Sequence, residues 1–317
     1  MRRDRRHRLS QQETVMQDLA NMQLKPMQKF RVFDPNPKTP SPLPPPKSCD
    51  SQFHIFAPAD QYPIRPGAAY HTPEATIGAA LRMHKALGIE RGVIVQSTAY
   101  GKDYRILLDG LKTAGPNYRG ITVIDDTVSD ADLQRMHDGG VRGIRFNYLK
   151  VLNIVPSPET LKRSIARAQD MGWFVKFNAS GEDLLAIEPI LRTIKTQAVV
   201  DHLAFPDFGR PVTQPGMRLV RDLMQQGNWW MMLSNGDRAS RQGHPWRDAI
   251  PYARSYIDVA PDRVIWGSDW PHPLVTEDQE MKNDGDLLEL LYSYTASEAI
   301  KRMILVDNPA VLFGFDR

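Results

Sequence analysis

The sequence is poor in several features that mark secreted, membrane-embedded and nucleotide-binding proteins. It contains one cysteine, Cys49, so no internal disulfide can form and we expect a reducing compartment, the cytoplasm. No apolar run approaches the roughly 18 residues that cross a bilayer, so we expect no membrane partner. No glycine-rich phosphate loop follows the first predicted strand, which argues against a dinucleotide cofactor.

Excess charge is also nearly absent once the amino terminus is set aside. The formal net charge is +3. The first eight residues hold five arginines and one aspartate, which gives +4 and leaves about −1 for the rest of the chain. The basicity therefore belongs to the tail, and we expect no nucleic-acid partner for the globular part.

Residues 1–48 lack the pattern of a folded domain. Positions 35–46 hold seven prolines, and a segment of this composition favours an extended linker with no core to bury. We therefore predict a disordered, basic and proline-rich extension at 1–48 and a single folded domain at 49–317.

From residue 49 onward, predicted strands and helices alternate eight times. The strands are expected at 50–56, 92–96, 120–124, 141–146, 173–177, 198–201, 229–233 and 264–266. Helical patterns lie at 75–87, 104–113, 130–137, 158–171, 182–194, 217–225, 246–259 and 286–312. Eight such units in roughly 270 residues predict an α/β fold, the (β/α)8 or TIM barrel, with a doubly wound sheet as the alternative.

Polar residues follow most of these strands, where the functional rim of such a barrel lies. Strand periodicity puts Gln52 and His54 on one face, and Arg145 with Asn147 likewise. The late strand at 264–266 ends in Gly-Ser and then delivers one carboxylate, Asp269. The remaining candidates are Gln96, Ser97, Asp125, Asp126, Lys176, Asn178, His202, Ser234 and Arg238.

Five motifs in this arrangement resemble the amidohydrolase superfamily over residues 49–315. They are DSQFH, GIRFN, VVDHLAFPD, WGSDWPHP and NPAVLF. They are most similar to the branch that contains 2-pyrone-4,6-dicarboxylate lactonase, 4-sulfomuconolactone hydrolase and galactarolactone isomerase. The resemblance implies a barrel enzyme in which water attacks a lactone. It also implies that Asp269 is the base or a metal ligand, that His202 belongs to the site and that Arg145 grips a substrate carboxylate.

Two positions depart from the pattern that the resemblance implies. Gln52 stands where the family has the first histidine of His-x-His, and an amide is a poor ligand for zinc. His54, His202 and Asp269 could still hold one zinc ion, which is the alternative. The resemblance to the lactonase implies a reaction without metal, so we favour a site without a metal cofactor. Phe205 stands where the family often has arginine, which disfavours a dicarboxylate substrate and leaves room for an apolar group.

Other polar residues carry weaker expectations. Lys176 either binds a substrate anion or forms an ion pair, because the carbamylated lysine of some amidohydrolases belongs to an earlier strand. Asp125 and Asp126 are expected to cap local structure, and His272 to orient its loop or touch substrate. We expect His71, His84, His137 and His244 to be ordinary surface or loop residues.

The predicted activity is hydrolysis of a carboxylated lactone. Asp269 would take a proton from water, and His54, His202 and Gln52 would hold the carbonyl oxygen. Substrate binding would fall to Arg145, Arg238, Asn147, Ser97, Lys176, Asn178 and His272. Lactone isomerisation, metal-dependent decarboxylation and a barrel that binds a ligand without turnover remain alternatives, and a homo-oligomer is compatible with the sequence.

Overall fold

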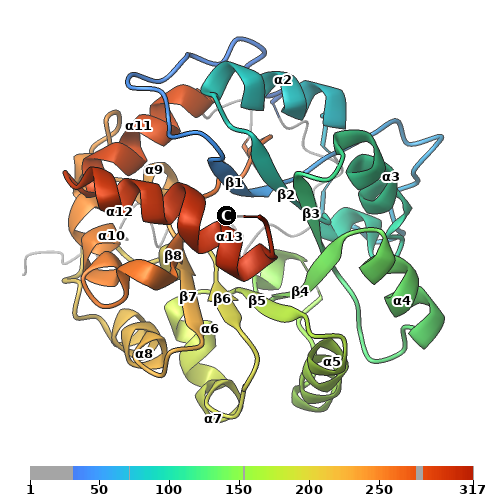
Figure 1. The fold of residues 1–317 in the computed structure, drawn as a ribbon. Helices are drawn as coiled ribbons and strands as arrows, with labels where there is room; N and C mark the ends of the chain where they lie inside the picture. The colour runs from blue at the N-terminus through green and yellow to red at the C-terminus, as the bar shows by residue number, and fades with distance from the viewer. Residues whose placement is uncertain (1–30, 71, 153, 276–280, 317) are drawn as a thin grey trace, which may run out of the picture.

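A computed structural model describes residues 31–70, 72–152, 154–275 and 281–316. Eight parallel strands lie side by side in chain order and form a barrel (Figure 1). They are β1 (Cys49–Phe53), β2 (Arg91–Val95), β3 (Tyr118–Thr122), β4 (Val141–Asn147), β5 (Phe174–Asn178), β6 (Ala198–Val200), β7 (Trp229–Met232) and β8 (Val264–Ile265). The barrel closes through backbone hydrogen bonds from Ser51 N to Trp266 O (2.9 Å) and from Asp269 N to Gln52 O (2.9 Å). The TIM-barrel prediction is confirmed.

Helices surround the strands (Figure 1). They are α2 (Ile77–Leu87), α3 (Arg105–Ala114), α4 (Asp130–Asp138), α5 (Pro158–Asp170), α6 (Gly181–Ala186), α7 (Glu188–Leu191), α8 (Pro215–Met224), α9 (Gly236–Ala239), α10 (Ile250–Ile257), α11 (Asp284–Tyr294), α12 (Glu298–Arg302) and α13 (Asn308–Phe313). Capping follows the sequence closely, since Ser129 and Ser157 accept hydrogen bonds from the first turns of α4 and α5. Two predicted helices are divided. The pattern at 182–194 breaks between α6 and α7, and the tail forms α11, α12, a π-helical turn and α13.

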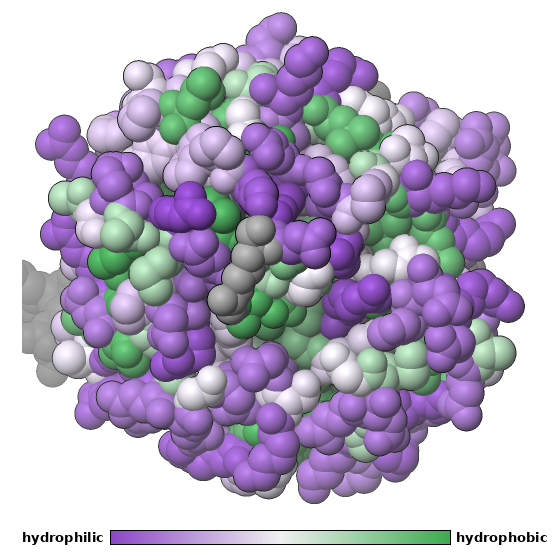
Figure 2. Space-filling view, in the orientation of Figure 1, coloured by the Kyte–Doolittle hydropathy of each residue, from purple (hydrophilic) through white to green (hydrophobic). Residues whose placement is uncertain are grey.

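The carboxyl-terminal helix covers one end of the barrel. Ala310, Phe313 and Phe315 pack against side chains inside it, among them Cys49 of β1 and Val93 of β2. Figure 1 looks onto this end, where α13 lies across the strands. The same face is mostly hydrophilic at its periphery, with apolar surface showing in gaps near the middle (Figure 2). With this end covered, the opposite rim is where strand-end side chains can meet a ligand.

The proline-rich segment is extended, as predicted, but it packs against the barrel. The Phe33 ring lies 4.6 Å from that of Trp270, and Arg31 N donates to Val275 O (3.0 Å). Lys38 pairs with Glu289 (2.6 Å) and Asp286 (2.9 Å) of α11. The expectation of disorder is therefore wrong for residues 31–48, because the barrel itself supplies the surface that the segment lacks; residues 1–30 lie outside the described chain.

Candidate functional site

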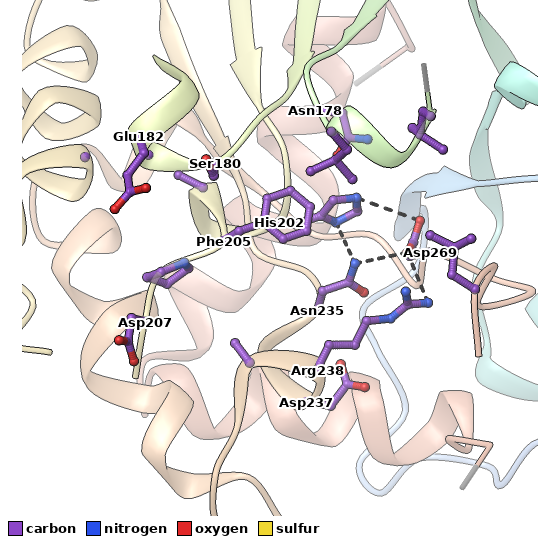
Figure 3. A pocket seen from close by; sticks show the side chains of 18 of the residues that line it. Asn178, Ser180, Glu182, His202, Phe205, Asp207, Asn235, Asp237, Arg238 and Asp269 are labelled. Atoms are coloured by element: carbon purple, nitrogen blue, oxygen red, sulfur yellow. Dashed lines mark hydrogen bonds and ion pairs between the residues drawn. The ribbon is translucent and has the colours of Figure 1, made fainter. Parts of the chain in front are cut away.

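Side chains from five strand ends meet around Asp269. Gln52 and His54 come from β1 and the residue just after it, Arg145 from β4, His202 from the residues after β6, and Asn235 from the loop after β7. They line or underlie a cavity of about 820 Å³, which lies within the roughly 300–1,000 Å³ of small-molecule pockets. Figure 3 shows His202, Asn235, Arg238 and Asp269 turned toward one another. The rim that the sequence predicts is where the cavity lies.

Asp269 is a buried carboxylate surrounded by donors. Gln52 Nε2 donates to Oδ1 (3.1 Å) and Asn235 Nδ2 to Oδ2 (3.0 Å). Arg238 Nη2 lies 3.5 Å from Oδ2. Burial alone would raise the pKa of Asp269, but His202, the hydrogen bond from His54 and the charge of Arg238 hold that pKa well below its usual value. Asp269 is therefore a carboxylate at neutral pH.

His202 faces the same point with a neutral ring. Its Nδ1 contacts Ser234 Oγ (2.8 Å), while its Nε2 faces two donors, Gln52 Nε2 (3.2 Å) and Arg145 Nη2 (3.3 Å). Burial lowers the pKa of His202 to about 4. Nε2 consequently accepts hydrogen bonds, so the predicted role of His202 in donating to a carbonyl oxygen does not match this arrangement.

His54 lies beside Asp269 on the cavity wall. Its Nδ1 lies 2.7 Å from the carbonyl oxygen of Val95, so this nitrogen must donate. Its Nε2 lies 3.4 Å from Asp269 Oδ1. Because His54 also lines the cavity, its Nε2 edge lies where a bound substrate would meet Asp269.

Arg145 and Lys176 share one buried carboxylate. Arg145 Nε lies 2.8 Å from Asp201 Oδ2, and Lys176 Nζ lies 3.0 Å from Asp201 Oδ1. Lys176 is 1% exposed and does not line the cavity. Of its two expected roles, the structure therefore shows the ion pair, while Arg145 reaches the cavity wall.

The other predicted binding residues divide between the wall and its support. Asn178, Arg238 and His272 line the cavity. Ser97 caps a short helical turn (Thr98–Tyr100) and contacts Tyr70 Oη (2.9 Å), and Asn147 accepts from Asn178 Nδ2 (2.8 Å). Both are buried beneath the wall, where they position cavity residues.

His272 belongs to a second charged group at the edge of the cavity. Its Nε2 lies 3.1 Å from Asp284 of α11. Burial opposes the charged form, yet Asp284 raises the pKa of His272. Asp237, which also lines the cavity, has its pKa raised by burial. The prediction that His272 orients its loop or touches substrate is compatible with both contacts.

Several of these side chains depend on a left-handed backbone. The φ angles of His202, Asn235, Asp269 and His272 lie between 52° and 61°. Leu203, Ala204 and Phe205 continue this conformation after His202. L-residues adopt it at a cost of roughly 1–2 kcal/mol each, and such strain gathers at functional sites. The turns aim these groups into the cavity from strands that have already ended.

A buried network supports β1 and β8 beneath the site. Asp50 Oδ1 accepts from Gln52 N (3.1 Å) and Ser268 N (2.9 Å), and Ser268 Oγ donates to Oδ2 (2.5 Å). His84 Nε2 lies 3.2 Å from the same carboxylate. The expectation of a surface position for His84 is wrong, because this residue of α2 is buried and turns inward to contact Asp50. His71 lies outside the described residues.

Sequence reasoning missed Asp50, Asp201, Asn235, Asp237 and Asp284. Asp201 directly precedes His202 at the end of a buried strand, and this place at a strand end was the available signal. Asn235 reaches the site through a left-handed backbone turn, which no sequence motif predicts. Asp125 caps its loop as predicted, since it accepts from Thr127 N (2.9 Å), whereas Asp126 forms an ion pair with Arg163 (2.5 Å).

Gln52 occupies the space between two of the alternative zinc ligands. Gln52 Nε2 lies between His202 Nε2 and Asp269 Oδ1, within 3.2 Å of both, and donates to them. A cation bound by those two atoms would need the place that the amide hydrogens occupy. Nowhere in the described chain do three His, Cys, Asp or Glu side chains form a group suited to a metal ion. The residues as arranged do not fit a zinc ion.

Known proteins share this fold and much of this sequence. Residues 49–315 match the Amidohydrolase family. A 4-sulfomuconolactone hydrolase of Hydrogenophaga intermedia is 34% identical over 85% of this chain and 89% of its own. A 2-pyrone-4,6-dicarboxylate hydrolase of Comamonas testosteroni is 32% identical over 88% and 93%. The crystal structure of a putative 2-pyrone-4,6-dicarboxylic acid hydrolase from Pseudomonas putida superposes with a TM-score of 0.74 at 28% identity, covering 86% of this chain and 98% of that one. The chain belongs to the amidohydrolase family.

No described helix combines the length and apolar character that a membrane span requires.

Proposed function

We propose that this protein hydrolyses a carboxylated lactone. The observation that carries the proposal is Asp269, an ionised carboxylate that lines the cavity beside His54 and Arg238. The two curated relatives described above are named as hydrolases of a pyrone dicarboxylate and a sulfomuconolactone, which supports lactone opening in this chain.

In the proposed reaction, Asp269 takes a proton from water as the water oxygen bonds to the lactone carbonyl carbon. His54 donates to the carbonyl oxygen as charge develops there, and the Arg145 guanidinium adds a positive charge nearby. The ring C–O bond then breaks. The proton held by Asp269 passes to the departing alkoxide, which gives a hydroxy acid and returns the enzyme to its starting state.

Arg145 and Arg238 would hold the substrate carboxylate. Both line the cavity, and an arginine fork matches a carboxylate in two-point geometry. A carboxylate bound to Arg238 would compete with Asp269 for that cation. Asp269 would then become a stronger base once substrate is in place.

We favour a reaction without a resident metal because Gln52 takes the position between His202 and Asp269. We also favour hydrolysis over lactone isomerisation, since Asp269 can accept a proton from water. A buried free Cys49 is compatible with the expected cytoplasmic location.

A panel of carboxylated lactones, assayed on protein of measured metal content, tests the proposal. We expect hydroxy-acid product, full activity after treatment with a chelator, and less than one metal ion per ten chains. Conversion of the substrate to an isomeric lactone would show that the activity is isomerisation and not hydrolysis. Loss of activity on chelation, restored by zinc, would overturn the metal-free reaction, and no turnover of any lactone would overturn the proposed function.

A further inference from the structure

The cavity has no excess of positive charge among the described residues that line it. Four of these residues are cationic: Arg145, Arg210, Arg238 and Lys282. Four are carboxylates: Glu182, Asp207, Asp237 and Asp269. Apart from Arg145, three lining cations face these four carboxylates, so a second substrate carboxylate would lose hydration without meeting a surplus cation among these residues.

Most of these cations are already engaged. Arg145 is held by Asp201 at 2.8 Å, and Arg238 lies 3.5 Å from Asp269 while donating to Pro273 O (3.0 Å). Lys282 lies over the Trp246 ring at 5.6 Å from its centre. Lys176 also pairs with Asp201, so the group of Arg145, Lys176 and Asp201 retains one net positive charge. That charge matches one substrate carboxylate.

The wall next to His202 is apolar. The ring of Phe205 meets that of His202 edge-on at 5.2 Å, and Phe205 is partly exposed toward the cavity. Figure 3 shows it beside His202, between Asp269 on one side and Glu182 and Asp207 on the other. The left-handed turn that orients His202 therefore also presents this aromatic face beside the reacting group.

Helices α6 and α8 extend the apolar wall. Leu185 of α6 and Met217 of α8 line the cavity, as does Leu152 from the turn after β4. The two helices meet through glycines, since a Cβ on Gly216 would lie 2.4 Å from Gly181 Cα. This contact closes the wall where larger residues would separate the helices.

We propose that the substrate is a lactone with a single carboxylate and an extended apolar substituent. Its carboxylate meets Arg145, and its substituent lies along Phe205 toward Leu185 and Met217. This inference rests on the proposed lactone hydrolysis for the reaction, but the shape and charge of the cavity carry it separately.

Binding of non-hydrolysable six-membered rings tests the inference without any turnover. By titration calorimetry on the full chain, we expect 3-butylbenzoate to bind at least tenfold more tightly than benzoate, because its alkyl chain leaves water for the apolar wall. We expect isophthalate, with a carboxylate at the same ring position, to bind no better than benzoate. Tighter binding of isophthalate than of 3-butylbenzoate, or no binding of either at millimolar concentration, would overturn the inference.

Turnover separates this inference from the proposed function. Among pyrones, we expect 4-butyl-2-pyrone-6-carboxylate to have a kcat/KM at least tenfold above that of 2-pyrone-4,6-dicarboxylate. The reverse order would be consistent with lactone hydrolysis but would contradict the proposed substrate class. Selective binding of 3-butylbenzoate without turnover of any pyrone would support the ligand preference of the cavity but contradict the proposed hydrolysis.

Variants of Phe205 test whether the apolar wall determines which ligand binds more tightly. Phe205→Arg adds a cation beside His202, and we expect it to bind isophthalate at least tenfold more tightly than the original protein does. Phe205→Leu keeps an apolar side chain and should retain the order of the two ligands. An unchanged order of ligands in a folded Phe205→Arg variant would contradict the assignment of this wall.

Discussion

At the scale of single residues, the site is a set of opposite charges held apart from water. Asp269 is ionised and His202 is neutral, although both are at most 4% exposed. Cations and donors surround the carboxylate, whereas burial lowers the pKa of the imidazole and keeps it neutral. Asp201 balances Arg145 and Lys176, so the buried cations do not stand alone. The residues that bind substrate thus also contribute to stability.

Substitution of Arg145 should therefore lower the stability of the protein more than substitution of Arg238. Arg145→Met is expected to raise KM for a carboxylated lactone by roughly tenfold or more, with little change for a neutral lactone. It should also lower the free energy of unfolding by a few kcal/mol, since Asp201 keeps only Lys176 as a partner. Arg238→Met removes the same charge from a side chain that is 30% exposed, and it should raise KM with less loss of stability. Equal losses on both lactones, measured by steady-state kinetics, would refute the carboxylate clamp.

His202 makes stability depend on pH. Its pKa is about 4 in the folded protein and 6.5 when exposed, so between these values the unfolded chain binds a proton that the folded chain does not. The free energy of unfolding should fall by about 3 kcal/mol as the pH drops from 7 to 4 on account of this residue.

Denaturant titrations of His202→Gln at several pH values measure that contribution. The variant should lose most of this pH dependence, whereas the same change at exposed His244 should keep it. Parallel curves for the original protein and His202→Gln would show that His202 is not kept neutral by the fold.

At the scale of elements, strands bring the side chains to the rim and left-handed turns aim them. The positions of Gln52, His54 and Arg145 were predictable because a strand alternates its faces and its end marks the rim. Asn235, Asp237 and Asp284 were not, because they depend on turns and on a helix whose contacts join distant parts of the chain. Lys176 was ambiguous for the same reason: only the fold shows that Asp201 faces it.

The left-handed turn at His202–Phe205 can be tested directly. Ala204 has φ 62°, a conformation that glycine adopts at no cost. Ala204→Gly should therefore leave the free energy of unfolding within about 1 kcal/mol, because relieved strain offsets the lost methyl group. Ala168→Gly, at a buried position within α5, should lower it by about 2 kcal/mol. Equal losses in chemical denaturation would show that the turn carries no strain.

At the scale of the whole molecule, both ends of the described chain support the barrel. The carboxyl-terminal helix α13 covers one end. Near the other end, residues 31–48 hold the loop after β8, since Phe33 packs on Trp270, the neighbour of Asp269. Composition alone predicted an unfolded extension because proline content says nothing about a surface elsewhere in the fold. The barrel itself was predictable from eight regular strand–helix units.

A chain that begins at residue 47 should accordingly be less stable than one that begins at residue 31. We expect its melting temperature to fall by several degrees, and its kcat to fall because the Asp269 loop loses a support. Phe33→Ala should reproduce part of both losses, whereas Val32→Ala, at a side chain 56% exposed, should not. Identical melting curves and rates for the two shortened chains would mean that the segment contributes nothing to the barrel.

The most direct test of the account is the Asp269→Asn variant, measured for rate, ligand binding and melting temperature on one preparation. Asparagine keeps the size of the side chain but cannot accept the proton from water. Hydrolysis of a lactone substrate should fall by roughly 10²–10⁴, while benzoate binding stays within about tenfold and the variant stays folded. A folded Asp269→Asn variant that hydrolyses the lactone at a near-normal rate would contradict the mechanism proposed here.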